Sequence, residues 1–191
     1  MPVTARSVST RSSTEGAPSP DAARPMRRFG PADAPRILAH LLALDADDRL
    51  LRFSYAIRDE GIDAYVTKLD FARDHVHGLC STHGDIVALA HVAEHQGEVD
   101  FGLSVAPCYR RRGLGRALFS HVIALARLRD AARVVCHSVS PAVLHMATSS
   151  GFRRPGGCLV APLTLELRAE PRPRDDARPC TPVSTGSPAA A

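Results

Sequence analysis

A run of arginines followed closely by two glycines is the stretch of this sequence whose possible chemistry is easiest to interpret. Residues 110–116 read RRRGLGR, and a segment of apolar residues at helical spacing begins within it. A helix start leaves up to four backbone N–H groups without intrahelical partners, and the helix dipole adds about half a positive charge there. Glycines let an anion approach the backbone closely, and arginine side chains add charge. The segment therefore has the chemistry of a diphosphate-binding loop.

An ordinary strand–helix turn on a basic surface would also explain the two glycines, and this alternative stays open at this point. Two nucleotide-binding motifs are excluded. A Walker loop needs the pattern GxxxxGK[ST], and no Lys-Ser or Lys-Thr pair follows a glycine in this chain. The dinucleotide fingerprint GxGxxG needs a third glycine at the position of Leu118.

The elements that position this loop follow from hydrophobic periodicity. Helical patterns are found at residues 30–53, 59–71 and 141–150, and in the segment after the arginine–glycine loop, whose apolar residues include Leu118, Val122, Ile123 and Leu125. Strand patterns are found at residues 75–82, 86–95, 99–107, 132–140 and 158–168. The predicted order is α-α-β-β-β-α-β-α-β. It indicates an α/β protein whose mixed sheet has helices on its faces.

One folded domain is predicted, over residues 26–169. Residues 1–25 are rich in Ser, Thr, Pro, Ala and Arg, and the tail over residues 170–191 has a similar composition. Such segments cannot bury enough apolar surface to fold, so both are predicted to be disordered. The first residues lack the apolar stretch of a secretory signal.

Composition limits the class of protein. Hydrophobic residues make up 45% of the chain, and the net charge is +4 with a pI of about 9.0. There is no apolar run of the ~20 residues that a membrane span needs. Basic residues do not alternate with aromatic ones, so no platform for nucleic acid is predicted. The five cysteines form no CxxC pair, which favours reduced thiols in a cytoplasmic protein and gives no support to a metal site.

Two motifs together resemble the GNAT (GCN5-related N-acetyltransferase) superfamily. The arrangement Arg110-x-x-Gly113-x-Gly115 is similar to the family's R/Q-x-x-G-x-G/A loop. Downstream, the segment SPAVLHMATSSGF, residues 140–152, resembles the second signature, in which an asparagine and apolar residues precede Gly-Phe. The resemblance spans roughly residues 26–168. Residues 47–71 show a more remote likeness to the bacterial branch that includes protein-lysine acetyltransferases.

The resemblance implies a splayed sheet that binds acetyl-CoA between its fourth and fifth strands. Ser140 stands where the family often has an asparagine that reaches the cofactor, and the shorter serine puts that contact in question. The backbone of three strand residues would pair with the pantetheine arm. The loop that Arg110 opens would bind the pyrophosphate through its amides. The implied cofactor-binding residues are therefore Leu103, Ser104, Val105, Arg110, Arg111, Arg112, Gly113, Leu114, Gly115, Arg116 and Ser140.

Acetyl transfer to an amine needs a neutral nucleophile, and a lysine-like amine with a pKa near 10.4 is mostly protonated at pH 7. A general base or a desolvated site must offset this. The resemblance suggests Glu98, at the start of the fourth strand, and Asp100 lies on the same side of that strand. A solvent-exposed acid at a strand end is the alternative for each. The backbone N–H of Val105 is the implied donor to the thioester oxygen.

The family's usual proton donor to the leaving thiolate is a tyrosine, and its position here is Ala147. His145, Tyr109 or a water molecule could replace it, or the thiolate could leave without an acid. Of these, His145 is the catalytic candidate.

Other histidines and one cysteine have simpler explanations. His91, His95 and His137 fall on strands, where each could relay a proton or serve as a structural residue. His75, His77 and His83 flank a turn and are predicted to be exposed, with only a faint suggestion of a metal site. Cys136 is predicted to be a buried, unreactive thiol.

The sequence thus predicts an acetyl-CoA-dependent N-acetyltransferase that uses no metal. The expected acceptor is a small amine, a protein lysine or a protein N-terminus. Neither a nucleic acid nor a membrane is expected as a partner, and a homodimer stays open. A module that binds acyl-CoA without catalysis is the main alternative. A nucleic-acid binder that uses the arginine-rich ends is disfavoured by the acids interspersed there.

Overall fold

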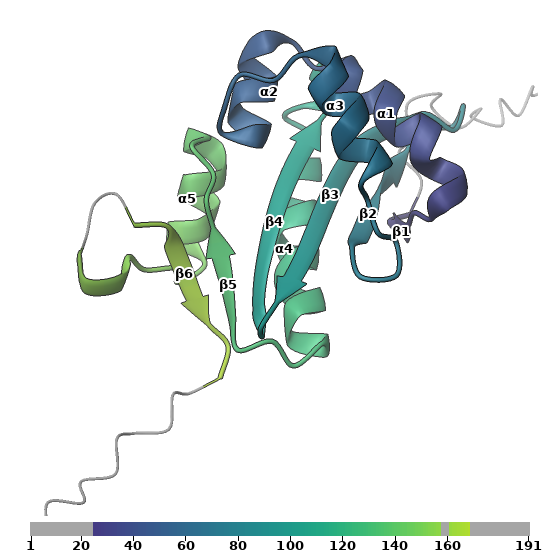
Figure 1. Ribbon diagram of the computed structural model, residues 1–191. Coiled ribbons are helices and arrows are strands. Elements are labelled where there is room, and N and C mark those ends of the chain that lie inside the picture. Colours follow the sequence, from purple (N-terminus) through teal and green to yellow (C-terminus); the bar gives the residue numbers. More distant parts are fainter. Residues whose placement is uncertain (1–24, 158–160, 169–191) are drawn as a thin grey trace, which may run out of the picture.

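A mixed β-sheet forms the centre of the molecule (Figure 1). The computed structural model describes residues 25–157 and 161–168, so the predictions for the two tails lie almost entirely outside the described residues. Within that part, six strands are ordered β1-β2-β3-β4-β5-β6, and all neighbours are antiparallel except β4 and β5. The strands are β1 (Arg27–Arg28), β2 (His75–Cys80), β3 (Ile86–His95), β4 (Glu98–Val105), β5 (Arg133–Cys136) and β6 (Leu163–Glu166).

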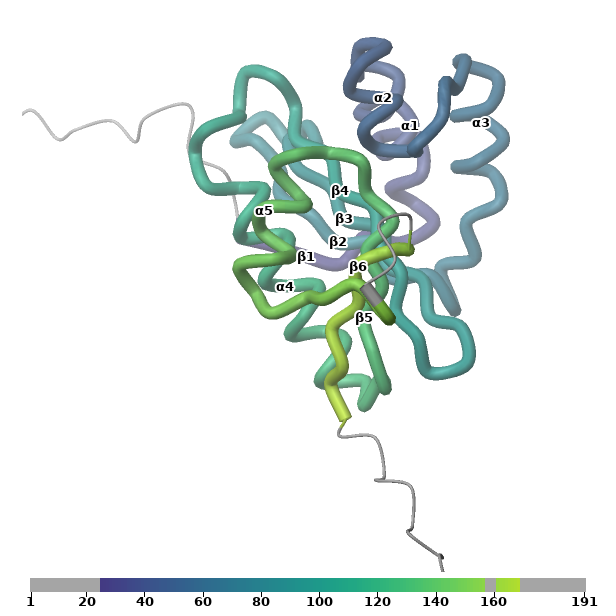
Figure 2. The backbone as a smooth tube through the Cα atoms, turned by 90° about the vertical axis from the view of Figure 1, so that its left-hand side faces the viewer, coloured from purple at the N-terminus to yellow at the C-terminus, as the bar shows by residue number. Residues whose placement is uncertain are grey.

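Helices cover both faces of the sheet, as Figure 2 shows. The helices are α1 (Ala34–Leu42), α2 (Ala46–Phe53), α3 (Asp59–Thr67), α4 (Leu114–Leu128) and α5 (Pro141–Ser149). On one face, α1 and α3 bury apolar side chains such as Ile37, Leu41 and Ile62 against β2 and β3. On the other face, α4 and α5 pack around Leu118 and Phe152. The predicted α/β fold, a mixed sheet flanked by helices, is confirmed.

The sheet is splayed between β4 and β5. Strand β4 pairs with β3 along its full length, from Glu98 opposite His95 to Val105 opposite Ala88. Its parallel pairing with β5 covers only residues 98–100. Strand β5 ends at Cys136, and the chain then turns away into α5, whose first residue is a proline. From residue 101 onward, the second edge of β4 therefore has no strand partner in the described part of the chain.

The N-terminal region differs from the sequence prediction in two ways. Residues 30–53 were expected to form one helix but form two, because Asp45 caps a new helix start by accepting a hydrogen bond of 2.8 Å from the N–H of Asp48. A short strand, β1, precedes them. Its two arginines carry no apolar alternation, so hydrophobic periodicity gives no sign of it.

A buried hydrogen-bond chain joins α1 to the last residues of β4. The carbonyl of Ile86 can only accept, so His40 donates its Nδ1–H to it over 2.9 Å, and Nε2 accepts from the hydroxyl of Ser104 over 2.8 Å. Burial lowers the pKa of His40 to about 4, with Arg52 adding to the effect and the Ile86 carbonyl opposing it. His40 is thus neutral in the folded protein at neutral pH.

This buried histidine makes stability depend on pH. The unfolded chain protonates His40 below about pH 6.5, whereas the folded chain does so only near pH 4, so stability falls as the pH drops through this window. Protonation of His40 in the unfolded chain lowers the free energy of unfolding by on the order of 3 kcal/mol at pH 4. Urea unfolding at pH 7, 6, 5 and 4 measures it. His40→Gln should be the less stable protein at pH 7, and the gap to wild type should close as the pH falls. If the stabilities of wild type and His40→Gln fell in parallel with pH, His40 would not be the group responsible.

None of the helices in the described ranges, 25–157 and 161–168, is long and apolar enough to cross a membrane.

Candidate functional site

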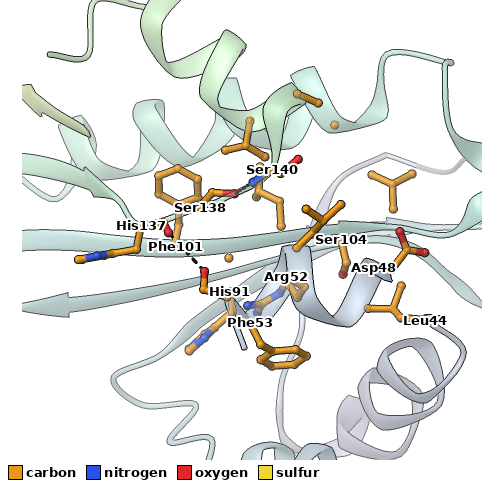
Figure 3. Close-up of a pocket in the computed structure, with 18 of the residues that line it drawn as sticks. Leu44, Asp48, Arg52, Phe53, His91, Phe101, Ser104, His137, Ser138 and Ser140 are labelled. Carbon is orange, nitrogen blue, oxygen red and sulfur yellow. Dashed lines mark hydrogen bonds between the residues drawn. The ribbon is translucent and has the colours of Figure 1, made fainter. Parts of the chain in front are cut away.

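A cleft of about 570 Å³ opens beside the unpaired part of β4. Its walls come from α2, α3, β3, β4, the segment after β5 and α5. Figure 3 shows side chains of α2, such as Arg52, and of the segment after β5, such as His137, on opposite sides of this cleft. The hydroxyl of Ser54, at the end of α2, donates to the His137 carbonyl over 3.3 Å and so connects the two walls.

The open edge of β4 presents backbone hydrogen-bonding groups to the cleft. The N–H of Ala106 donates to Val87 on β3 over 2.9 Å, and backbone groups alternate sides along a strand. The N–H and C=O groups of Leu103 and Val105 therefore face away from β3, toward the splay. Ser104 has the opposite parity, so its backbone faces β3 and its side chain is held by His40. All three residues line the cleft, but two of them offer backbone groups to a ligand.

The arginine–glycine loop lies at one end of this edge, where β4 leads through a short 3-10 helix to α4. Gly113 has φ +80° and caps α4, a conformation in which a side chain is strained. Arg111 has φ +60°, which is uncommon outside glycine and is often found at functional sites. Arg111, Arg112, Gly113 and Arg116 are exposed, whereas Leu114 and Gly115 are half-buried and Gly115 lines the cleft. Mostly exposed residues thus surround the start of a helix, where the first N–H groups have no intrahelical partner.

Arg110 anchors the loop instead of extending into solvent. Its guanidinium forms an ion pair with Asp48 of α2, and its Nε donates to the carbonyl of Val105 over 3.2 Å. Arg112 lies over the ring of Tyr109, with 5.3 Å from Cζ to the ring centroid. These contacts hold the loop next to the end of β4.

The two acids proposed as bases occupy different surroundings. Asp100 lines the cleft, accepts from the N–H of Phe101 over 2.9 Å and lies 3.9 Å from Nε2 of His137. Glu98 lies two residues earlier, outside the cleft, and forms an ion pair with Arg133 of β5. The structure therefore brings Asp100 and His137 together at the cleft and leaves Glu98 beyond its end.

Helix α5 contributes apolar side chains to the cleft. Val143 and Met146 line it, and Ser140 lies at its margin, where its N–H donates to the hydroxyl of Ser138 over 3.1 Å. His145 is exposed and does not line the cleft. Ala147, at the position of the family's tyrosine, is fully buried in the core.

The sequence did not indicate a chain of polar side chains that lies on the α2, α3 and β3 side of the cleft. Arg52 donates from Nη2 to the hydroxyl of Tyr65 over 2.9 Å, and this hydroxyl lies 2.7 Å from Nδ1 of His91. Nε2 of His91 lies 3.2 Å from a carboxylate oxygen of Asp74. Because the Tyr65 oxygen already accepts from Arg52, its proton points to Nδ1, and Nε2–H faces Asp74. Burial lowers the pKa of His91, as does Arg52, while Asp74 opposes them.

The remaining histidines and cysteines only partly follow the predictions. His75 was expected to be exposed but is buried on β2, at 7% exposure, and His77 on the same face, also expected to be exposed, is half-buried. His77 contacts His121 of α4 over 3.0 Å, and burial lowers the pKa of His77 to about 4. His83 is exposed at the turn, as predicted. Cys136 is buried, as predicted, and burial raises the pKa of its thiol. Across residues 25–157 and 161–168, no group of three or more His, Cys, Asp or Glu side chains could hold a metal ion.

Solved structures share this fold. The GNAT domain of PAT from S. lividans superposes with a TM-score of 0.59 at 21% sequence identity, covering 76% of this chain and 90% of that one. The ribosomal-protein-S18-alanine N-acetyltransferase from Escherichia coli gives a TM-score of 0.54 at 18% identity, covering 78% of this chain and 96% of that one. At these identities the likeness shows the fold alone.

Sequence comparison adds a relative and a family. The chain is 33% identical over 143 residues to mycothiol acetyltransferase from Clavibacter sepedonicus, an alignment that covers 72% of this chain. It spans 45% of that relative, so less than half of the relative's length is represented here. The family model of the acetyltransferase (GNAT) family matches residues 42–152, which include β4, the arginine–glycine loop and α5. A splayed sheet, an open strand edge and this match agree, and the chain belongs to the GNAT family of acetyltransferases.

Proposed function

We propose that this protein transfers the acetyl group of acetyl-CoA to a primary amine, by direct attack of the amine while both substrates are bound. One observation carries the proposal: the unpaired edge of β4 connects a loop suited to a diphosphate with a cleft that contains Asp100 and His137. Membership of the acetyltransferase family supports the acyl group. GNAT acetyltransferases use acetyl-CoA, which supplies an acetyl group already activated as a thioester.

The residues present fit this substrate. The amides of residues 111–116 surround the start of α4, a helix of 15 residues, and would hold the pyrophosphate. The outward N–H and C=O groups of Leu103 and Val105 would pair with the pantetheine arm as an added strand does. Gly115 keeps this path open, because a Cβ there would meet nothing closer than Val105 Cγ2 at 3.9 Å. Val105, the donor that the resemblance implies, lies five residues from Asp100, roughly 16 Å along the strand. The outward N–H of Leu103, which is nearer Asp100, would instead donate to the thioester oxygen.

Asp100 is the group on this chain best placed to accept the proton of the attacking amine. It lies in the cleft on β4, two residues before Gly102, and its side chain is 54% exposed, so the proton can pass on to water. His137, 3.9 Å away, can share this proton. General-base catalysis of this kind contributes about 10²- to 10⁴-fold in rate.

Loss of the thiolate needs no side-chain acid here. Ala147 offers no proton, and His145 is exposed away from the residues that line the cleft. A thiol has a pKa of about 8.5, so it can leave as the thiolate near neutral pH. We therefore assign no role in proton donation to His145.

Acetyl-CoA binding followed by an acceptor panel tests the proposal. Acetyl-CoA should raise the melting temperature, and the panel should contain small amines, lysine peptides and peptides with free N-termini, with thiol release as the readout. Release of free thiol with at least one amine, together with the acetylated product by mass spectrometry, is the expected result. Binding of acetyl-CoA without transfer to any amine would instead favour the module that binds acyl-CoA without catalysis.

Partners and location follow the same reasoning. We propose that the acceptor is neither a nucleic acid nor a membrane lipid, because the cleft is small and lined by aromatic and apolar groups as well as charges. The described cysteines, Cys80, Cys108 and Cys136, are free thiols, which supports a reducing compartment such as the cytoplasm.

A further inference from the structure

Arg52 places a positive charge in the part of the cleft formed by α2, α3 and β4. Its guanidinium lies directly against the backbone of β4, where a Cβ on Gly102 would come within 1.9 Å of Nη1. Gly102 therefore provides the space that the guanidinium occupies. Aromatic rings hold it from the other side, with Cζ 4.9 Å from the ring centroid of Phe53 and 5.7 Å from that of Tyr65.

This charge has no carboxylate partner. Among residues 25–157 and 161–168, no Asp or Glu oxygen lies within 4.0 Å of the Arg52 nitrogens, although many other arginines of the chain have one: Arg27, Arg36, Arg49, Arg73, Arg110, Arg129, Arg133 and Arg168. The nearby acid Asp48 is engaged by Arg110. Nε of Arg52 is buried without a hydrogen-bond partner.

The groups in direct contact with Arg52 are neutral. Tyr65 is a neutral acceptor for Nη2, and His91 behind it stays neutral because burial and Arg52 itself lower its pKa. A partly buried cation without a counter-ion is unfavourable, and an anionic ligand that forms charge-assisted hydrogen bonds with it relieves this cost. Arginine is especially suited to a carboxylate, because its planar group can donate two parallel hydrogen bonds.

The opposite charge lies close by on the same strand. Asp100 and Gly102 lie on the same face of β4, and residues two apart in a strand are separated by roughly 7 Å. The cleft thus offers a carboxylate at Asp100 and a guanidinium over Gly102. This pattern complements a small molecule with an ammonium group and a carboxylate group a few bonds apart.

We propose that the amine acceptor carries a carboxylate, as a free amino acid does, and that Arg52 binds this carboxylate while the amine lies beside Asp100. The inference rests on the proposed acetyl transfer and narrows its acceptor. In this proposal, Arg52 makes the protein prefer acceptors that carry a carboxylate over acceptors that do not.

Matched acceptors test this inference. The free L-amino acids and their carboxamides differ in the carboxylate and, because the carboxylate raises the pKa of the neighbouring ammonium, in the fraction of neutral amine. Both series are assayed by thiol release at saturating acetyl-CoA, and kcat/KM is compared per neutral amine. We expect wild type to prefer the acid over its amide by about 10-fold or more in kcat/KM, the usual scale for one charged hydrogen-bonded pair. In Arg52→Gln this ratio should fall to near one, while the Kd for acetyl-CoA stays unchanged.

Controls separate specificity from folding. Arg58→Gln removes the same charge from an exposed arginine that caps α3 outside the cleft, and it should keep the wild-type ratio. Binding of the N-acetylated amino acids and of their amides, measured calorimetrically without turnover, should show the same preference and the same dependence on Arg52.

The possible results are distinguishable. If wild type acetylates amides as well as acids, or if Arg52→Gln keeps the preference, the inference is wrong while the proposed acetyl transfer stands. If acetyl-CoA binds but no amine of either series is acetylated and no N-acetylated product binds, the inference about Arg52 is also wrong. Transfer to other amines would then decide the proposed function separately.

Discussion

Replacing Gly115 with leucine is expected to weaken acetyl-CoA binding by about 100-fold or more, ~3 kcal/mol, while leaving the fold intact. Gly115 is the second residue of α4 and lines the cleft, and a Cβ there has only an ordinary contact with Val105. A leucine side chain would therefore extend into the space that we assign to the coenzyme. The melting temperature should not fall, because leucine favours a helix by up to ~1 kcal/mol over glycine.

Gly115→Ala is the matched control. Its Cβ fits at the contact distance of 3.9 Å, and the family loop accepts either Gly or Ala at this position, so binding should stay within a few-fold of wild type. Titration calorimetry with acetyl-CoA measures both variants. Wild-type affinity in the leucine variant would show that the coenzyme does not lie against Gly115.

Asp100→Asn is expected to lower kcat by about 10²- to 10⁴-fold, the scale of general-base catalysis, with little change in the Kd for acetyl-CoA. Asparagine keeps the size of the side chain and can still accept from the N–H of Phe101, but it cannot take up a proton from the amine. The assay is the initial rate of thiol release with the best acceptor, measured in parallel with acetyl-CoA binding.

Glu98→Gln provides the comparison on the same strand. Glu98 shares the side of β4 with Asp100 but pairs with Arg133 outside the cleft, so its loss should change kcat less than about 3-fold and stability by at most ~1 kcal/mol. The reverse pattern, a large loss in Glu98→Gln and none in Asp100→Asn, would make Glu98 the base, as the resemblance first suggested.

Local patterns predicted most of the fold. Strand β3 was placed from an apolar segment that follows a turn, and helix α5 from a proline start, and the structure has them at Ile86–His95 and Pro141–Ser149. These elements follow from contacts between residues close in sequence. The division of residues 30–53 was missed although Asp45 carried a capping signal, because the apolar spacing on its two sides could be read as one helix.

The cleft was predicted only in part, for a physical reason. The loop and the open strand edge are contiguous in sequence, so a motif can reveal them. The chain from Arg52 through Tyr65 and His91 to Asp74 joins α2, α3, β3 and the segment before β2, and only the folded sheet brings these together. In the helical pattern of residues 59–71, Tyr65 shares a face with Ile62, Val66 and Leu69, and no local spacing indicates that its hydroxyl reaches His91.

The central claim is that the open edge of β4 binds the coenzyme, and amide hydrogen exchange followed by NMR tests it most directly. Addition of acetyl-CoA should slow exchange at the N–H groups of Leu103 and Val105 and across residues 111–116 by about 10-fold or more. The N–H of Ser104, which already faces β3, should change far less. Unchanged exchange at Leu103 and Val105 with saturating acetyl-CoA, or protection confined to another surface, would contradict the account.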